Sequence, residues 1–254
     1  MSRKLEYYIK LWEKKKKQVI SYYDESKTDI EKEIEYYLGK IREKDSDIID
    51  TYYMMSKYYM RYGELKYLVQ DDVKEYKKYF YLSAKAANLC IKLLNKEIQT
   101  FERVRRDLLS YGGIYATIQA IIAGDNELAL QLAGEKSMIG CILLERYEEA
   151  QQYTIPYDEE TYVNQTFISV ARGDEEMLKK SVESAIKYIR KDARMDVTLI
   201  DEYSLAAVIL ARKRGMNFDI HVAEIPEGLL EDTPLDYESL KLPIPEHVQE
   251  LLEK

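Results

Sequence analysis

Few residues in this chain have the types and spacing that catalysis or metal binding requires. The chain contains two histidines, His221 and His247, and two cysteines, Cys90 and Cys141. It has no CxxC, HExxH or EF-hand pattern, so the sequence gives no support for a zinc or calcium site. We therefore predict no bound metal, no cofactor and no catalytic residues, and we expect that the protein is not an enzyme.

Other short motifs also give no support for a catalytic or nucleotide-binding site. The loop Gly134–Ser137 resembles part of a phosphate-binding loop, but a glutamate separates its glycine from its lysine and no earlier glycine has the required spacing. Neither a GxSxG nor a GxGxxG motif occurs. Glutamate pairs such as Glu31 with Glu35 fall on amphipathic helical patterns, where they are typical of solvent-facing charges rather than of an acid and a base.

Tyrosine is the most unusual part of the composition, with 24 tyrosines against 4 phenylalanines. Doublets such as Tyr36–Tyr37 and Tyr52–Tyr53 place one ring toward a helix interface and its neighbour farther round the helix. The simplest interpretation is that these amphipathic side chains lie at the edge of the core. They could also form a protein-binding face, or stack nucleic-acid bases while Lys14–Lys17 and the arginines of 103–106 bind phosphates.

The distribution of charge disfavours a nucleic-acid partner. The net charge is −8; residues 1–110 contain 24 basic and 19 acidic residues, whereas residues 111–254 contain 14 and 27. A strongly acidic second half repels phosphate backbones. We therefore expect no nucleic-acid ligand, and an acidic surface toward the C-terminus.

The sequence also favours a cytoplasmic location. The N-terminal residues lead into Lys14–Lys17 without the apolar run of a secretory signal. The uncharged stretch Leu108–Gly124 is too short and too polar to span a membrane, so we expect no membrane partner. Both cysteines lie in apolar helical patterns, which is typical of buried thiols in a reducing compartment.

Helices dominate the predicted structure. The first proline is Pro156, so 155 residues precede the strongest helix breaker. Apolar spacing predicts a helix over 3–23, a second that begins at a capping box at Thr28, and a third over 47–68 that Gly63 could kink or end. A fourth begins at Asp71–Asp72. Its apolar residues recur every three or four positions along one face: Val73, Tyr76, Phe80, Ala84, Ala87, Ile91, Leu94 and Ile98.

Two similar turns indicate helical hairpins farther along the chain. Gly124–Asp125 and Gly173–Asp174 each follow an apolar helical segment and precede another, at an offset of 49 residues. Glycine can adopt the left-handed conformation that ends a helix, and aspartate can cap the next helix. This pattern favours stacked hairpins of the tetratricopeptide or HEAT type.

The C-terminal part is predicted to be less regular. The last long helix is expected over about Asp196–Arg214, with Gly215 as its stop, and the later prolines keep the tail irregular until Pro245 begins a short final helix. The predicted fold is all-α, an antiparallel helical bundle that continues into stacked helical hairpins. We expect one domain over 1–254, with two sub-bundles over 1–100 and 101–254.

From about residue 100 to 232 the chain resembles the immunity protein 49 family of bacterial polymorphic toxin systems. The resemblance is carried by Ala120–Ala129, the turn Gly173–Asp174, and the run Tyr203–Met216 that leads into Glu224–Leu230. It covers about half of the chain. It implies an all-helical, non-catalytic cytoplasmic protein that binds and neutralises a toxin domain, which is the function we predict.

The acidic segments are the candidate toxin-facing surface, since they could cover the basic cleft of a toxin such as a nuclease. We place the partner-binding residues in the loop Tyr153–Glu160 and in 219–232: Tyr153, Tyr157, Asp158, Glu159, Glu160, Asp219, Glu224 and Asp232. Two other functions stay open, a helical scaffold or regulatory module unrelated to toxins, and an enzyme with a buried carboxylate or tyrosine site. The tyrosine-rich half could also form a homodimer.

Overall fold

The chain is all-helical, as the sequence predicts. The computed structural model describes residues 3–43, 47–108, 113–155, 162–191, 199–217 and 220–253. Within these ranges the chain forms helices α1 to α14 and no β-strand, apart from an isolated bridge between Val222 and Ile225. None of the helices in these ranges combines the length and the apolar composition needed to cross a membrane.

The chain forms two compact units, and each unit consists of two separate segments. Unit 1 comprises Met1–Tyr22 and Ala133–Asp232, and unit 2 comprises Tyr23–Leu132 and Thr233–Lys254. This division differs from the expected sub-bundles over 1–100 and 101–254. The difference arises because α1 (Arg3–Ser21) packs against α11 (Glu175–Lys191), while the C-terminal segment packs against α4 (Val73–Asn95).

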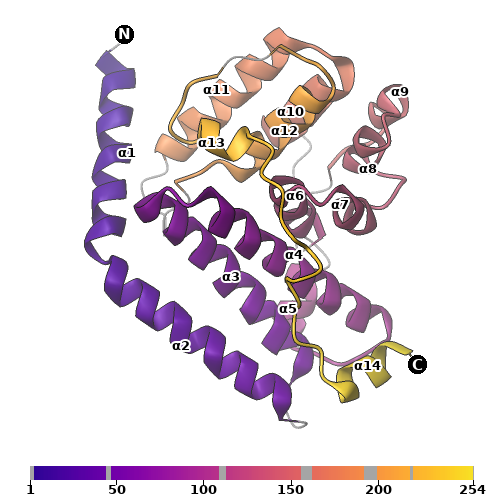
Figure 1. Cartoon of the computed structure of the whole chain (residues 1–254). Helices are drawn as coiled ribbons and strands as arrows, with labels where there is room; N and C mark the ends of the chain where they lie inside the picture. Colours follow the sequence, from indigo (N-terminus) through magenta and orange to yellow (C-terminus); the bar gives the residue numbers. More distant parts are fainter. Residues whose placement is uncertain are drawn as a thin grey trace. The chain divides into compact units, whose positions relative to one another are not determined.

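Unit 2 is built around the antiparallel hairpin of α3 (Ile48–Gln70) and α4 (Figure 1). Asp47 caps α3 by accepting a hydrogen bond from the Asp50 N–H, and Asp72 caps α4 by accepting one from the Glu75 N–H. The other helices of the unit are α2 (Tyr23–Arg42), α5 (Glu102–Asp107), α6 (Gly113–Ala123), most of α7 (Asn126–Ala133) and α14 (Glu246–Glu253).

Gly63 lets α3 and α4 approach closely, and α3 continues through it to Gln70. A Cβ atom at this position would lie 3.1 Å from the carbonyl oxygen of Tyr76 and 3.1 Å from the Cβ atom of Tyr79. Any larger residue would therefore push the two helices apart. The missing side chain at Gly63 thus allows the close packing of α3 against α4, which explains why a glycine occurs inside a long helix.

Helix α4 is buried on more than the single face that its apolar stripe predicts. Tyr76, Phe80, Ala84 and Ala87 of the stripe are buried, and so are residues on other sides of the helix. Helices α3, α6 and α14 all pack against α4, which accounts for this coverage. The additional buried residues are Lys77, Tyr81, Leu82, Ser83, Ala86, Leu89, Cys90 and Leu93.

The tyrosines of unit 2 confirm the arrangement expected of the doublets. Tyr52 is fully buried, whereas Tyr53 is half-buried. In the doublet at 36–37, Tyr36 is exposed, and Tyr37 stacks on Tyr58 with ring centroids 5.8 Å apart. Burial raises the pKa of Tyr59 to about 12, so this hydroxyl remains protonated at neutral pH. Most rings of α3 and α4 therefore serve as core and core-edge residues.

The expected start of the second helix at Thr28 is wrong. Helix α2 begins at Tyr23, and only Tyr22 separates it from the end of α1. The Thr28 hydroxyl donates to the Asp24 carbonyl oxygen at 2.8 Å, the back-bonding typical of threonine inside a helix. Asp24 and Glu25 lie in the first turn of α2 and suit its positive end, so acidic residues mark this N-terminus in place of the predicted capping box.

The C-terminal segment of unit 2 is fixed by tyrosine hydroxyls. Tyr237 donates to the Ala123 carbonyl oxygen at 2.9 Å, and its ring lies against Tyr81 with centroids 5.0 Å apart. Tyr52 donates to the Pro243 carbonyl oxygen at 2.6 Å. Beyond Pro245 the chain forms α14, as predicted. An irregular segment thus gains a defined path because side chains of the helical core bind its backbone.

Unit 1 is a set of short hairpins with α1 packed on one of them. The hairpin of α10 (Tyr162–Arg172) and α11 is its largest element, and α10 also packs against α8, α9 and α12. Trp12 of α1 donates its indole N–H to the Leu199 carbonyl oxygen at 3.0 Å. The remaining helices are α8 (Met138–Leu143), α9 (Tyr147–Ala150), α12 (Glu202–Lys213) and α13 (Glu227–Leu230).

Both predicted Gly–Asp turns are confirmed. Gly124 in unit 2 and Gly173 in unit 1 have φ angles of 90° and 69°, in the left-handed region that favours glycine. Asp125 then accepts a hydrogen bond from the Leu128 N–H at 2.9 Å, and Asp174 accepts one from the Met177 N–H at 2.8 Å. Each unit therefore contains one helical hairpin closed by the same chemistry.

The last long helix begins later than the sequence predicts. Leu199 and Ile200 are buried but precede the helix, and Asp201 is the N-cap of α12. Residues 192–198, which include the expected start at Asp196, lie outside the described residues. The end of the helix is as predicted, with Gly215 at a φ angle of 83°.

Candidate functional site

The structure describes three of the eight predicted partner-binding residues. Tyr153, Glu224 and Asp232 belong to unit 1. The other five lie outside the described residues: Tyr157, Asp158, Glu159, Glu160 and Asp219.

Glu224 is a correction to the predicted surface. Its side chain is fully buried, so it is not available to a partner. The Glu224 carbonyl oxygen accepts a hydrogen bond from the Asp201 N–H at 2.9 Å, just before α12. A single acidic residue in an irregular segment gives no sign of burial, because the apolar spacing that identifies inward positions in a helix is absent there. Glu224 therefore belongs to the interior of unit 1.

Asp201 forms a second buried carboxylate next to Glu224. Its carboxylate accepts hydrogen bonds from the Ser204 N–H at 3.1 Å and from the Ser204 hydroxyl at 2.5 Å. Burial raises the pKa of Asp201 to about 6, and the negative charge of Glu224 acts in the same direction, while the hydrogen bonds from Ser204 oppose the shift. This carboxyl group therefore changes charge near pH 6.

Asp232 lies on the surface, as predicted, but its neighbour is basic. Burial lowers the pKa of Lys213 at the end of α12, and the charge of Asp232 partly opposes this effect. The two side chains thus form a mixed-charge region rather than part of a continuous acidic field. Asp232 and Tyr153 are the two predicted residues whose exposure in the structure fits a surface role.

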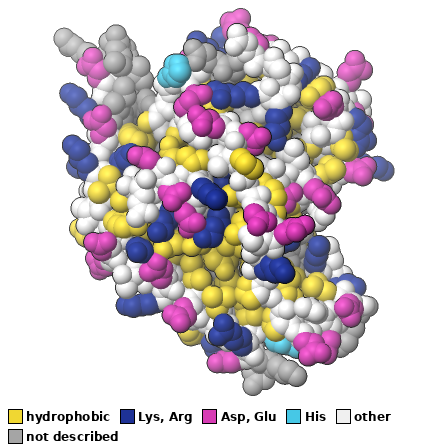
Figure 2. Space-filling view, in the orientation of Figure 1, with side chains coloured by type: hydrophobic (Ala, Val, Ile, Leu, Met, Phe, Trp, Pro, Cys, Tyr) yellow, Lys and Arg dark blue, Asp and Glu magenta, His cyan; other side chains and the backbone are white. Residues whose placement is uncertain are grey.

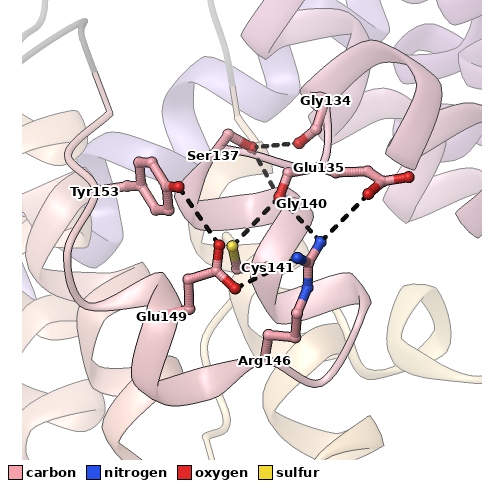
Figure 3. Close-up of polar contacts among 8 residues, drawn as sticks. All are labelled: Gly134, Glu135, Ser137, Gly140, Cys141, Arg146, Glu149 and Tyr153. Carbon is pink, nitrogen blue, oxygen red and sulfur yellow. Dashed lines mark hydrogen bonds and ion pairs between the residues drawn. The ribbon is translucent and has the colours of Figure 1, made fainter.

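Tyr153 is half-exposed at the edge of a polar cluster, which Figure 3 shows. Its hydroxyl donates to Glu149 Oε1 at 3.5 Å, and Glu149 comes from the short helix α9. Cys141 of α8 belongs to the same cluster, and its thiol donates to the Glu135 carbonyl oxygen at 3.3 Å. The cluster thus joins α8, α9 and the loop before α8.

Arg146 holds this cluster together. Its guanidinium group donates to the Glu135 carbonyl oxygen at 3.2 Å and to Glu149 Oε2 at 3.3 Å, and it lies 3.7 Å from Glu135 Oε2. A guanidinium group can make several such bonds at once in a fixed geometry. Arg146 therefore fixes the acidic side chains relative to one another without neutralising all of them.

The loop Gly134–Ser137 is a structural turn. The Ser137 hydroxyl donates to the Gly134 carbonyl oxygen at 2.9 Å and accepts from the Gly140 N–H at 3.0 Å, so it caps α8 (Figure 3). A Cβ atom at Gly140 would lie 1.9 Å from the Gly134 carbonyl oxygen. The interpretation of this tetrapeptide as an ordinary loop is consistent with these contacts.

The start of the acidic loop is also fixed. The Ile155 N–H donates to Asn164 Oδ1 at 2.7 Å, and Asn164 Nδ2 donates to the Ile155 carbonyl oxygen at 3.1 Å. Both residues are buried. The side chain of α10 thus pairs with the main chain at the point where the described residues stop before 156–161.

The chemistry of the cluster does not favour nucleophilic catalysis. Cys141 is buried, and burial together with the nearby charge of Glu149 raises the pKa of its thiol, so the thiol is protonated at neutral pH. Within the described ranges, no three histidine, cysteine, aspartate or glutamate side chains are grouped so that they could hold a metal ion. What the cluster offers is an ordered set of hydrogen-bond acceptors at a surface.

Several acidic residues of this surface are not among the predicted partner-binding residues, although the sequence pattern predicts that Glu148 and Glu149 face solvent. Glu145 and Glu148 are exposed close to Tyr153 in the chain, and Gln151 and Gln152 continue the exposed edge. Glu135 is exposed beside Arg146. The sequence signal available was the run Glu145–Gln152, in which polar residues outnumber apolar ones. We define the acidic edge of unit 1 as Glu135, Glu145, Glu148, Glu149 and Tyr153.

Comparison with known proteins gives no further guide to this site, since no protein-family model, curated protein or solved structure matches the chain.

Proposed function

We propose that the protein is a non-catalytic immunity protein that binds and neutralises a cognate bacterial toxin through the acidic edge of unit 1 and the adjoining residues 156–161. The main support is that the acidic edge combines exposed carboxylates with a fixed framework. Arg146 and Asn164 hold the flanking segments in place. A surface ordered before binding loses less conformational entropy when a partner docks.

The chemistry of the edge suits a basic partner surface. Glu135 and Glu148 are exposed, and the Glu135 side chain retains 72% of its accessible area beside Arg146. On the face drawn in Figure 2, acidic and basic side chains are otherwise interspersed, and neither sign forms a continuous field there. A local acidic edge next to a tyrosine would provide both electrostatic steering and a hot-spot side chain.

The direct experiment is co-expression with the protein encoded immediately upstream. We expect the chain to rescue growth when that neighbour is toxic alone, and affinity capture to recover a stable complex. If the neighbour is expressed and toxic but is neither neutralised nor captured, the immunity proposal is wrong and a helical scaffold becomes the better candidate.

The position of the surface is tested by charge reversal. Replacing both Glu145 and Glu148 with lysine, or Asp158, Glu159 and Glu160 with lysine, should weaken toxin binding about ten-fold or more without loss of folding. The matched control is the pair Glu176→Lys and Glu183→Lys on the exposed face of α11. Equal affinity of all variants, measured by calorimetry, would exclude this surface while leaving the rescue result intact.

A further inference from the structure

Unit 2 carries a basic patch that the proposed toxin-binding edge of unit 1 does not use. Lys57 and Arg61 lie one helical turn apart on α3, and Arg103 and Arg106 lie on the short helix α5. All four residues have exposed surface, and Lys57 is also partly shielded from solvent because its ammonium group lies over the Tyr53 ring. We call these four residues the α5 cationic patch.

Two contacts bring the helices of the patch together. The Tyr53 hydroxyl of α3 donates to Asp107 Oδ2 of α5 at 2.8 Å. The Lys57 ammonium group lies 4.2 Å from the centroid of the Tyr53 ring, a cation–π contact. Arg103 precedes Asp107 by one helical turn, and its charge acts on both Tyr53 and Lys57, so Arg103 lies close to α3. Arg106 lies on the same side of α5 as Arg103.

Three of the four cations of the patch are close enough to repel one another: Lys57, Arg61 and Arg103. Burial lowers the pKa of Lys57; the charges of Arg103 and Arg61 lower it further, and Asp107 opposes them. Like charges held together in this way raise the free energy of the unliganded surface. The negative charge of an anionic partner would offset this repulsion, so binding of such a partner is electrostatically favourable.

The surroundings of the patch distinguish between anionic partners. Glu102 is exposed and Asp107 is half-exposed, so acidic groups interrupt the cations, and the patch suits separated carboxylates better than the evenly spaced phosphates of a nucleic acid. Phe101 precedes α5 with 67% of its surface exposed. Carboxylates match the guanidinium geometry, and an exposed phenyl ring offers a contact for an apolar side chain.

We propose that the α5 cationic patch binds an acidic segment of a partner protein, with Phe101 contacting an apolar side chain of that segment. The proposal does not depend on the toxin-binding function, because the patch lies in the other unit and has the opposite charge. It adds a second docking surface of defined chemistry.

The test uses the full chain and two labelled probes, a peptide in which glutamates alternate with neutral residues around a central leucine, and an oligodeoxythymidine of equal net charge. Binding is measured by fluorescence anisotropy at low and at physiological ionic strength. We expect the peptide to bind more tightly than the oligonucleotide. Replacing Arg61 and Arg103 with glutamate should weaken the peptide about ten-fold or more, and Phe101→Ala should weaken it to a smaller extent.

The control variant carries Lys32→Glu and Lys74→Glu, two exposed lysines of α2 and α4, and reverses the same amount of charge. It should bind the peptide as the unaltered chain does. Equal weakening in this control would show a general charge effect and overturn the proposal. Tighter binding of the oligonucleotide would assign the patch to nucleic acid, and absence of peptide binding with an unchanged circular dichroism spectrum would also overturn it.

Discussion

Asp201 links the stability of unit 1 to pH. Its folded-state pKa of about 6 lies above the ordinary value of 3.8. Between these values the unfolded chain releases the proton while the folded chain keeps it, so ionisation of Asp201 lowers stability as pH rises from about 4 to above 6. This cost disappears well below the ordinary pKa of 3.8, where both states are protonated. A shift of this size corresponds to roughly 2–3 kcal/mol.

Asp201→Asn should remove this dependence and keep the N-cap, because asparagine caps helices as well as aspartate does. The quantity to compare is the free energy of unfolding of the variant minus that of the unaltered chain. We expect this difference to increase by roughly 2–3 kcal/mol from pH 4 to pH 7. Urea titrations at a series of pH values measure this difference. A difference that is constant across the series would contradict the role given to Asp201.

Gly140 is the position where an added methyl group should be most harmful. A Cβ atom would overlap the Gly134 carbonyl oxygen at 1.9 Å and would displace the loop that caps α8. Gly140→Ala should lower the free energy of unfolding by about 3 kcal/mol, the upper part of the usual range for overpacking. Gly39→Ala is the control, since nothing lies within 4 Å of its Cβ position and alanine favours the helix. Thermal unfolding compares the two, and similar melting temperatures would refute the explanation.

At the scale of elements, each Gly–Asp turn contains a capping hydrogen bond from the aspartate side chain, and a single substitution removes that bond. Asp174 is exposed, so replacing it affects the cap of α11 and little else. Asp174→Ala should cost about 1 kcal/mol, and Asp174→Asn should cost much less because the amide oxygen still accepts from the Met177 N–H. Chemical denaturation distinguishes these outcomes, and equal losses for both variants would rule out the capping bond as the cause.

The elements also show what the sequence predicts well. Helix ends marked by aspartate or glycine, as at Asp72 and Gly215, are predicted correctly because a single side chain or a single φ angle determines them. The start of α2 is not predicted, because Thr28 can bond to the backbone inside a helix as readily as at its cap.

The candidate site is harder to predict than the helices. Tyr153 and Asp232 lie on the surface as expected, whereas Glu224 is buried. Its burial results from packing between segments that are far apart in the chain, and charge alone does not reveal such packing. The contribution of Arg146 has the same origin, since its contacts with Glu135 form only when α9 folds against the loop before α8.

At the scale of the whole molecule, the division into units explains why the boundary near residue 100 does not appear. Composition changes near that point, but packing assigns α1 to the same unit as α11 and the C-terminal segment to the unit of α4. Such non-local pairings leave little trace in local patterns. The long hairpin α3–α4, which pairs neighbours in the chain, is by contrast clear from its apolar spacing.

Trp12 should therefore support unit 1 and not unit 2. Its indole N–H bonds to Leu199, and it is the one tryptophan in the sequence. Trp12→Ala should speed amide hydrogen exchange in α11 about ten-fold or more, which corresponds to a loss of about 1.4 kcal/mol, and should leave α3 and α4 unchanged. Trp12→Phe, which keeps an aromatic ring but no donor, should have a smaller effect. Equal acceleration in both units would contradict the assignment of α1 to unit 1.

Helix α1 can dock only after the ribosome has synthesised the distant segment that it contacts. Trp12 and Leu199 are separated by 187 residues, so at about 5–20 residues per second the ribosome needs roughly 10–40 s to produce the segment on which α1 docks. Helices form within about a microsecond, and the α3–α4 hairpin can pair long before that interval ends. The nascent chain thus carries a basic amphipathic helix with its tryptophan uncovered for many seconds before the segment on which it docks is made.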